Sequence, residues 1–160
     1  MDRPVSGPVT TEFGAVDLLT YTDGFHTGID LAGEVGTPII QPVDGEVVVV
    51  QHVGGRGLTV SVQSGGVIRR YAHLSGDHLH ASARVALSAG DVAGYVGMTG
   101  FTTGPHLHYE AFIDPLALEE ALGHLDVLWG TAVLASNLGH FALAATISAR
   151  IIAIKGLLGL

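Results

Sequence analysis

The stretch Gly104-Pro105-His106-Leu107-His108-Tyr109-Glu110 predicts a β-strand that follows a glycine-rich loop, residues 98–105. Alternate residues of a strand point to the same face of a sheet, so His106 and His108 are expected to project together. Upstream, His26-Thr27-Gly28-Ile29-Asp30 supplies a histidine and a carboxylate four residues apart, and Tyr71-Ala72-His73-Leu74 supplies another histidine. Imidazole and carboxylate groups are ligands that zinc accepts, so the three segments together predict a catalytic zinc site.

Composition limits the fold class. The chain has 160 residues, enough for one modest domain with a core, and 48% of them are hydrophobic. Its 23 glycines and valine-rich runs indicate short strands separated by turns. Because there is no cysteine, disulfides and cysteine-bound zinc are excluded, and a transition metal must be held by histidine, aspartate or glutamate.

The pattern predicts an all-β domain up to about residue 114. Asp44-Gly45 between apolar runs is a hairpin or tight-turn signal, and Ser64-Gly65-Gly66 predicts another turn. A short helix is expected over 115–125, with Asp114 as N-cap and Pro115 at the first helical position. Short strands are expected within residues 35–40, 46–50, 58–62, 67–72, 85–97 and 106–111.

Charge divides the chain into an expected main domain, 1–126, and an apolar tail, 127–160. The net charge is −8, and all 15 acidic residues precede residue 127. An acidic domain does not suit a phosphate backbone, so no nucleic-acid partner is expected. Residues 127–149 contain no Asp, Glu, Lys or Arg over 23 positions, long enough to cross a bilayer as a helix. We expect this tail to contact a membrane, or to pack in an oligomer or virion.

The motifs occur in the order found in lysostaphin/LytM-type zinc endopeptidases, which cut peptidoglycan, and the chain resembles that family over roughly residues 8–113. Besides the three histidine segments, the resemblance rests on glycine-containing motifs between them. These are Gly36-Thr37-Pro38-Ile39, Asp44-Gly45-x-Val47, Gly55-x-Gly57, Ala89-Gly90-Asp91-x-x-Gly94 and Gly97-x-Thr99-Gly100-x-x-Thr103-Gly104.

The resemblance implies a mainly β fold, a compact antiparallel β-sandwich (LytM-like, a duplicated hybrid motif) with Zn²⁺ in a groove along one sheet. It implies His26, Asp30 and His108 as zinc ligands and His73 and His106 as the catalytic pair. The implied substrates are the peptide stems or cross-bridges of peptidoglycan, and the implied site of action is the cell wall, outside the cytoplasm. Tyr21, five residues before His26, is a candidate further active-site residue.

Other functions and other candidate residues can be weighed against this interpretation. His52, His78, His80, His124 and His140 match no motif and are expected at the surface or in loops, and Glu110 is expected to support the strand or a ligand. A biotinyl or lipoyl carrier would need an exposed acceptor lysine, and the single lysine is Lys155 in the tail. The sequence is also compatible with a non-catalytic structural or wall-binding protein that has the same fold. For an enzyme, it does not decide whether the bond cut lies in a glycyl bridge or in a direct D-Ala cross-link. The N-terminus has no apolar secretory signal, which suggests an enzyme carried on a phage virion or tail tip.

Overall fold

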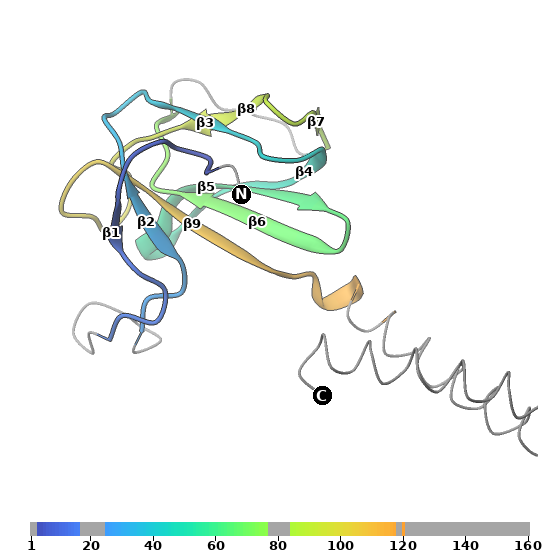
Figure 1. The fold of residues 1–160 in the computed structure, drawn as a ribbon, viewed down its shortest axis with the longest axis horizontal. Coiled ribbons are helices and arrows are strands. Elements are labelled where there is room, and N and C mark those ends of the chain that lie inside the picture. Colours follow the sequence, from blue (N-terminus) through green and yellow to red (C-terminus); the bar gives the residue numbers. More distant parts are fainter. Residues whose placement is uncertain (1–2, 17–24, 77–83, 118–119, 121–160) are drawn as a thin grey trace, which may run out of the picture. The chain divides into compact units, whose positions relative to one another are not determined.

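The strands and turns that build the fold are seen in a computed structural model, which describes residues 3–16, 25–76, 84–117 and 120 (Figure 1). A 3-10 turn, η1 (Gly54–Arg56), separates two long strands of this fold. The strands among the described residues are β1 (Val9–Thr11), β2 (Ile29–Ala32), β3 (Pro38–Ile40), β4 (Gly45–Val53), β5 (Gly57–Ser64), β6 (Val67–Ala72), β7 (Ala86–Leu87), β8 (Val92–Tyr95) and β9 (His106–Ile113).

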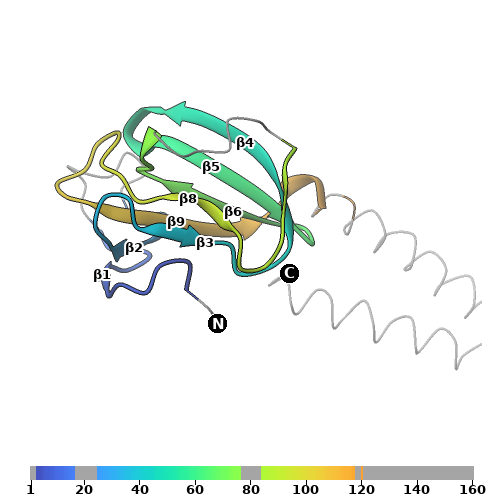
Figure 2. The same ribbon diagram turned by 90° about the horizontal axis from the view of Figure 1, so that it is seen from above.

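The strands form two antiparallel sheets of unequal size. Seven strands make the large sheet in the order β1-β2-β9-β6-β5-β4-β7, and β3 pairs with β8 in a second sheet. Figures 1 and 2 show β3 and β8 lying over one face of the large sheet. Ile39 of β3 and Ala93 of β8 are buried in one hydrophobic cluster with Val60 and Leu107 of the large sheet. The prediction of a mainly β, antiparallel fold is therefore confirmed.

The pairing of β9 with its neighbours positions the residues singled out in the sequence. Leu107 and Tyr109 face the hydrophobic cluster, so His106, His108 and Glu110 point to the opposite face of the large sheet. On one side of β9, Asp30 of β2 lies directly opposite His108. On the other side, β6 is in register with β9, with Ala72 opposite His108 and Arg70 opposite Glu110.

The Asp44-Gly45 turn does not close a hairpin. β3 pairs with β8, whereas β4 pairs with β5 and β7, so the turn carries the chain from the small sheet into the large one. The hairpin alternative was wrong because Ile39 is fully buried in the layer that covers the large sheet, away from β4. The predicted strand within 58–62 and the turn at 64–66 are confirmed.

The C-terminal predictions fall largely beyond the described part of the chain. The nine strands of the described residues lie in the first compact unit, Met1–Asp114, and helical backbone begins at Pro115 as predicted. The rest of the expected helix is mostly outside the described residues, as is the whole tail, 127–160. The domain boundary at residue 126 stays a prediction. Among the described residues, no helix has the length and apolar character needed to span a membrane.

Candidate metal centre

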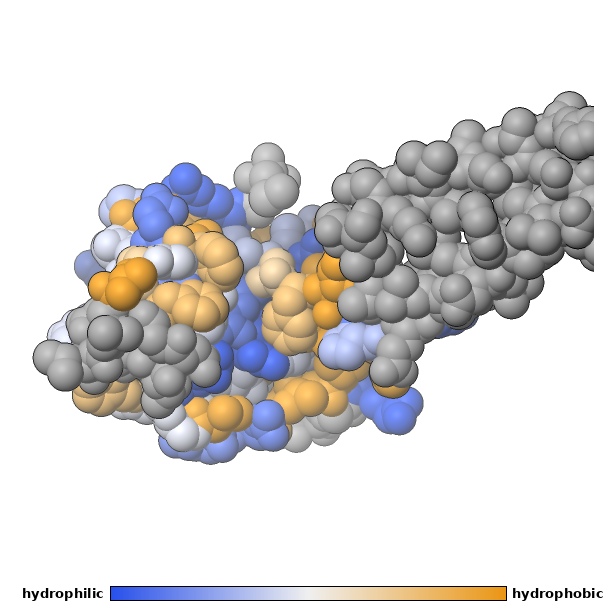
Figure 3. Space-filling model, turned by 90° about the horizontal axis from the view of Figure 1, so that it is seen from below, coloured by the Kyte–Doolittle hydropathy of each residue, from blue (hydrophilic) through white to orange (hydrophobic). Residues whose placement is uncertain are grey.

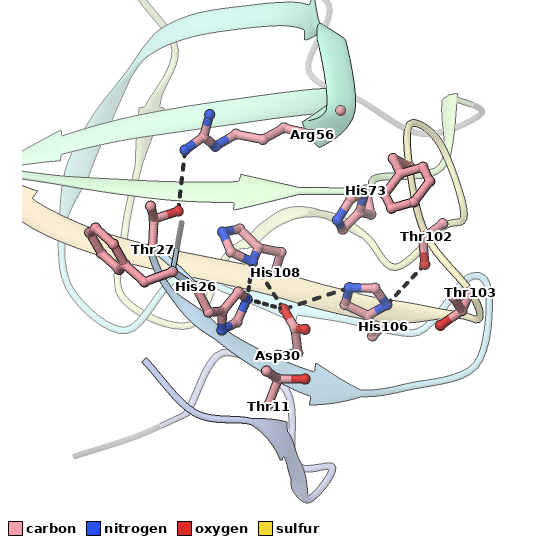
Figure 4. A pocket seen from close by; sticks show the side chains of 13 residues that line it. Thr11, His26, Thr27, Asp30, Arg56, His73, Thr102, Thr103, His106 and His108 are labelled. Carbon is pink, nitrogen blue, oxygen red and sulfur yellow. Dashed lines mark hydrogen bonds and ion pairs between the residues drawn. The ribbon is translucent and has the colours of Figure 1, made fainter. Parts of the chain in front are cut away.

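Three donor atoms from β2, β9 and the residues before β2 converge on one point (Figure 4). Asp30 Oδ1 lies 3.0 Å from His26 Nε2 and 2.9 Å from His108 Nδ1, and the two imidazole nitrogens are 2.9 Å apart. This is the arrangement expected of residues that share a single small cation. The structure therefore brings together the three residues that the family resemblance implied as zinc ligands.

The outer nitrogen of each histidine is tied to an acceptor. His26 Nδ1 donates to the carbonyl oxygen of Glu12 at 2.9 Å, and His108 Nε2 donates to Glu110 Oε1 at 3.1 Å. In neutral imidazoles these bonds leave the inner nitrogens as acceptors, so three lone-pair donors face one another. Such a set requires a positive charge between its members, and the same outer contacts are typical of histidines that bind metals.

Glu110 is held by an unusually large set of donors. Its carboxylate is 5% exposed. It accepts hydrogen bonds from Thr27 Oγ1 (2.6 Å), Arg56 Nη2 (2.9 Å) and Arg70 Nη1 (2.7 Å), besides His108. Burial raises the pKa of Glu110, but the bonds from His108, Thr27 and Arg56 outweigh it and hold that pKa far below its usual range. Glu110 is therefore an anion at neutral pH that orients His108, in agreement with the supporting role expected for it.

The carboxylates of Asp30 and Glu110 also favour a positive charge at the donor cluster. Burial raises the pKa of Asp30, but the contact with His108, which becomes a donated hydrogen bond when that ring is protonated, and the charges of the neighbouring histidines lower it overall. Burial lowers the pKa of His108, and the hydrogen bonds to Asp30 and Glu110 raise it by more. Both shifts have one cause, since two carboxylates flank the imidazole and stabilise positive charge at its position.

His73 and His106 line the same pocket beside the donor cluster. Their ring centroids are 4.7 Å apart, and His106 Nε2 lies 3.6 Å from Asp30 Oδ1. His73 Nδ1 donates to the Thr99 carbonyl and His106 Nδ1 to the Gly104 carbonyl, each at 2.8 Å, so in the neutral rings both Nε2 atoms are acceptors. Mainly because of burial, the pKa of His73 is lowered, which keeps this ring neutral near pH 7.

The end of β6 turns His73 toward the pocket through an uncommon backbone conformation. His73 has a φ of +60°, a left-handed value that few non-glycine residues adopt. Its backbone N–H donates to the Arg56 carbonyl at 2.9 Å, and the Leu74 N–H donates to the Leu58 carbonyl at 3.0 Å. These two bonds hold the end of β6 against η1 and the start of β5. The sequence contains no signal for this conformation, because it depends on contacts between segments far apart in the chain.

An open pocket surrounds these groups on the face of the large sheet away from β3 and β8. In Figure 3, hydrophilic residues form a band across this face, with hydrophobic residues on either side. The sequence analysis assigned no role to Arg56, the middle position of the Gly55-x-Gly57 motif, or to Thr27 of the His26 motif. The pocket is lined by Thr11, Phe25, His26, Thr27, Asp30, Gly55, Arg56, His73, Phe101, Thr102, Thr103, His106 and His108.

The remaining histidines and Tyr21 separate into two groups. His52 lies on β4 and is exposed, as expected of a histidine outside the motifs. His78, His80, His124, His140 and Tyr21 lie outside the described residues. The candidate role of Tyr21 therefore stays a prediction.

Gly28, between His26 and Asp30, allows the chain to lie close to β9. A Cβ atom at this position would lie 2.4 Å from the Tyr109 carbonyl oxygen and 3.0 Å from both Glu110 Cγ and His108 Cε1. Only glycine lets the chain before β2 approach β9 this closely, and that approach brings His26 and Asp30 onto His108.

An antiparallel β-protein with a His–Asp–His donor set at the base of an open pocket has the architecture of a single-metal hydrolase. Residues 24–118 match peptidase family M23, and the chain belongs to that family. The resemblance noted in the sequence is thereby confirmed.

Two curated relatives and one solved structure illustrate the match. The chain is 42% identical over 108 residues to the DD-carboxypeptidase/endopeptidase Mpg of Neisseria meningitidis, covering 66% of this chain and 24% of the relative. It is 39% identical over 89 residues to the peptidoglycan DD-endopeptidase ShyA of Vibrio cholerae, covering 55% and 20%. A zinc-containing peptidase from Vibrio cholerae has the same fold, with 28% identity and a TM-score of 0.62 over 70% of this chain and 36% of that one. The chain thus spans a quarter or less of the length of these curated relatives.

Proposed function

We propose that this chain is a zinc-dependent endopeptidase that cleaves the peptide cross-links of bacterial peptidoglycan. The observation that carries the proposal is the convergence of His26, Asp30 and His108 within a pocket that also contains two further histidines. Support for zinc comes from the donor set and from the zinc-containing relative of this fold. Support for the substrate comes from ShyA, which is described as a peptidoglycan DD-endopeptidase.

In this proposal His26, Asp30 and His108 are the zinc ligands. The fit rests on the donors themselves, since two imidazole nitrogens and one carboxylate oxygen face one another and the outer contacts to Glu12 and Glu110 fix their orientation. Three protein ligands are the number found in catalytic zinc sites, which keep a further position open. Bound there, zinc would supply Lewis-acid polarisation of the scissile carbonyl and acidify a water molecule.

His73 and His106 are proposed as the catalytic pair. Each has its Nδ1 proton committed to a backbone carbonyl, so Nε2 is the atom available to the substrate. The neutral His73 ring can accept a proton from the attacking water, and a protonated ring of the pair can donate to the leaving amine or to the carbonyl oxygen. Asp30, 3.6 Å from His106 Nε2, would stabilise the charge on His106 when that ring is protonated.

The proposed site of action is the cell wall, with peptide stems or cross-bridges as partners. We propose residues 1–126 as the peptidase domain and residues 127–160 as a segment for membrane or assembly contact. Carriage on a phage virion or tail tip stays a hypothesis from the sequence, which proteomic analysis of purified virions tests. The alternative is a non-catalytic wall-binding protein, which would bind cell walls without releasing fragments.

Digestion of purified cell walls tests the proposal. The zinc-loaded protein is incubated with walls that carry direct or glycyl cross-links, and released fragments are identified by mass spectrometry. We expect new amino termini at cross-links with the wild-type chain and none with His73→Ala. Release of the same fragments by His73→Ala, or binding to walls without cleavage by the wild type, would rule out the proposed enzyme.

A further inference from the structure

Arg56 is the one lysine or arginine among the described residues that line the pocket. It ends η1, and its side chain is 33% exposed. Figure 4 shows Arg56 beside Thr27 on one side of the pocket, whereas Thr102 and Thr103 lie beside His106 on the other. A substrate that crosses the metal centre from His106 would therefore approach Arg56.

Hydrogen bonds from two of its three nitrogens hold the Arg56 guanidinium group in place. Nε donates to Glu110 Oε1 at 3.1 Å, and Nη2 donates to Glu110 Oε1 at 2.9 Å and to Thr27 Oγ1 at 3.2 Å. Among the residues that the structure describes, Nη1 has no hydrogen-bond partner. Because a guanidinium is planar and rigid, fixing Nε and Nη2 also fixes the two N–H donors of Nη1.

The charge of Arg56 is not fully balanced by its neighbours. Arg56 and Arg70 both contact the single carboxylate of Glu110, so this cluster of three side chains carries one excess positive charge. Arg70 reaches Glu110 Oε2, packs over the ring of Phe112 at 4.8 Å and does not line the pocket. The excess charge is therefore presented to the pocket through Arg56.

The guanidinium lies close to the point where a peptide would be cut. Glu110 Oε1 is 2.9 Å from Arg56 Nη2 and 3.1 Å from His108 Nε2, so one carboxylate oxygen bridges the arginine and a proposed zinc ligand. An extended peptide advances about 3.5 Å per residue. A substrate group bound by Arg56 would then lie within about three residues of the scissile bond.

We propose that Arg56 binds a free carboxylate of the substrate peptide and makes the enzyme selective for anionic cross-linked peptides. A carboxylate matches the planar donors of a guanidinium, and a neutral amide does not offer the same charge-assisted bond. The carboxylate belongs either to the end of a peptide chain or to a side chain near the cut. This inference rests on the proposed function, and it assigns the substrate class of the same site.

Four synthetic cross-linked peptides distinguish these sources. The first carries both the terminal and the side-chain carboxylate, the second and third have one of them converted to an amide, and the fourth has both converted. We measure kcat/KM for each peptide, and the Kd of each cleaved product for the zinc-loaded full chain by calorimetry. Wild type, Arg56→Gln and the control Arg70→Gln are compared, because both arginines contact Glu110 but only Arg56 lines the pocket.

The wild-type chain is expected to prefer one carboxylate over its amide by about tenfold, equivalent to one charge-assisted hydrogen bond. In Arg56→Gln the preference should disappear from both kcat/KM and Kd. Arg70→Gln should change kcat/KM for all four peptides by one common factor and keep the preference for the carboxylate, as expected of a purely structural effect on Glu110. An Arg56→Gln variant that keeps the preference, or a wild type without one, overturns the inference. If no peptide is cut, the proposed activity fails, and the product Kd values alone decide the role of Arg56.

Discussion

Replacing Gly28 with alanine should weaken metal binding without touching a proposed ligand. The added Cβ would lie 2.4 Å from the Tyr109 carbonyl oxygen, where an ordinary contact is 3.4 Å or more. Both groups are backbone or fixed to it, so the clash cannot be relieved by rotating a side chain. The chain before β2 must move away from β9 by about 1 Å, and it carries His26 with it and displaces Asp30, two residues further on in β2.

The geometry of the donor set gives the expected size of the effect. The inner atoms of His26, Asp30 and His108 lie 2.9–3.0 Å apart, and metal–ligand distances tolerate only about 0.2 Å. A shift of about 1 Å therefore exceeds what the site can absorb, and we expect zinc affinity to fall by about 10- to 100-fold. Overpacking of this kind typically costs about 1–3 kcal/mol, which corresponds to a decrease in Tm of several degrees.

Zinc affinity is measured by competition with a chromogenic chelator, and Tm is measured on the metal-free protein by circular dichroism. Gly76→Ala is the control, because among the described residues a Cβ atom there meets only Leu58 Cδ2, at 3.9 Å. The control should match the wild type in both measurements. Wild-type zinc affinity in Gly28→Ala would show that the close approach of β2 and β9 does not set the geometry of the centre.

Three further predictions concern the site and the tail. His108→Ala should lose zinc in elemental analysis, whereas His73→Ala should keep zinc and lose about 100-fold or more in turnover, and the opposite pattern would contradict the proposed roles. Since the folded-state pKa of Glu110 is depressed, its stabilising contribution is present above about pH 4.5 and is lost as pH falls from there toward the folded-state pKa. In urea titrations of the metal-free protein, the stability difference between wild type and Glu110→Gln should therefore shrink on acidification, and a constant difference would argue against a depressed pKa. Truncation after Asp126 should leave a zinc-loaded, active protein, and a folded but inactive fragment would show that the tail completes the site.

Much of the fold and of the site could be predicted from local sequence patterns. The alternation in residues 106–110 placed His106 and His108 on one face, and the glycine turns correctly separated the strands around residues 58–72. These features depend on residues close together in the chain, since the direction of a side chain on a strand follows from a period of two. The family resemblance that rests on the order of the histidine motifs also implied which residues would meet.

The partners of those residues depended on the tertiary structure. The strand at 38–40 pairs with residues 92–95 rather than with its successor in sequence, and Asp30 faces His108 because β2 and β9 are neighbours. The contacts of Glu110 with Arg56 and Thr27 likewise join segments that no local pattern connects. The sequence by itself determined which side chains share a face of a strand. Only the tertiary structure decided which strands lie side by side and in what register, because that depends on how all the apolar faces are buried together.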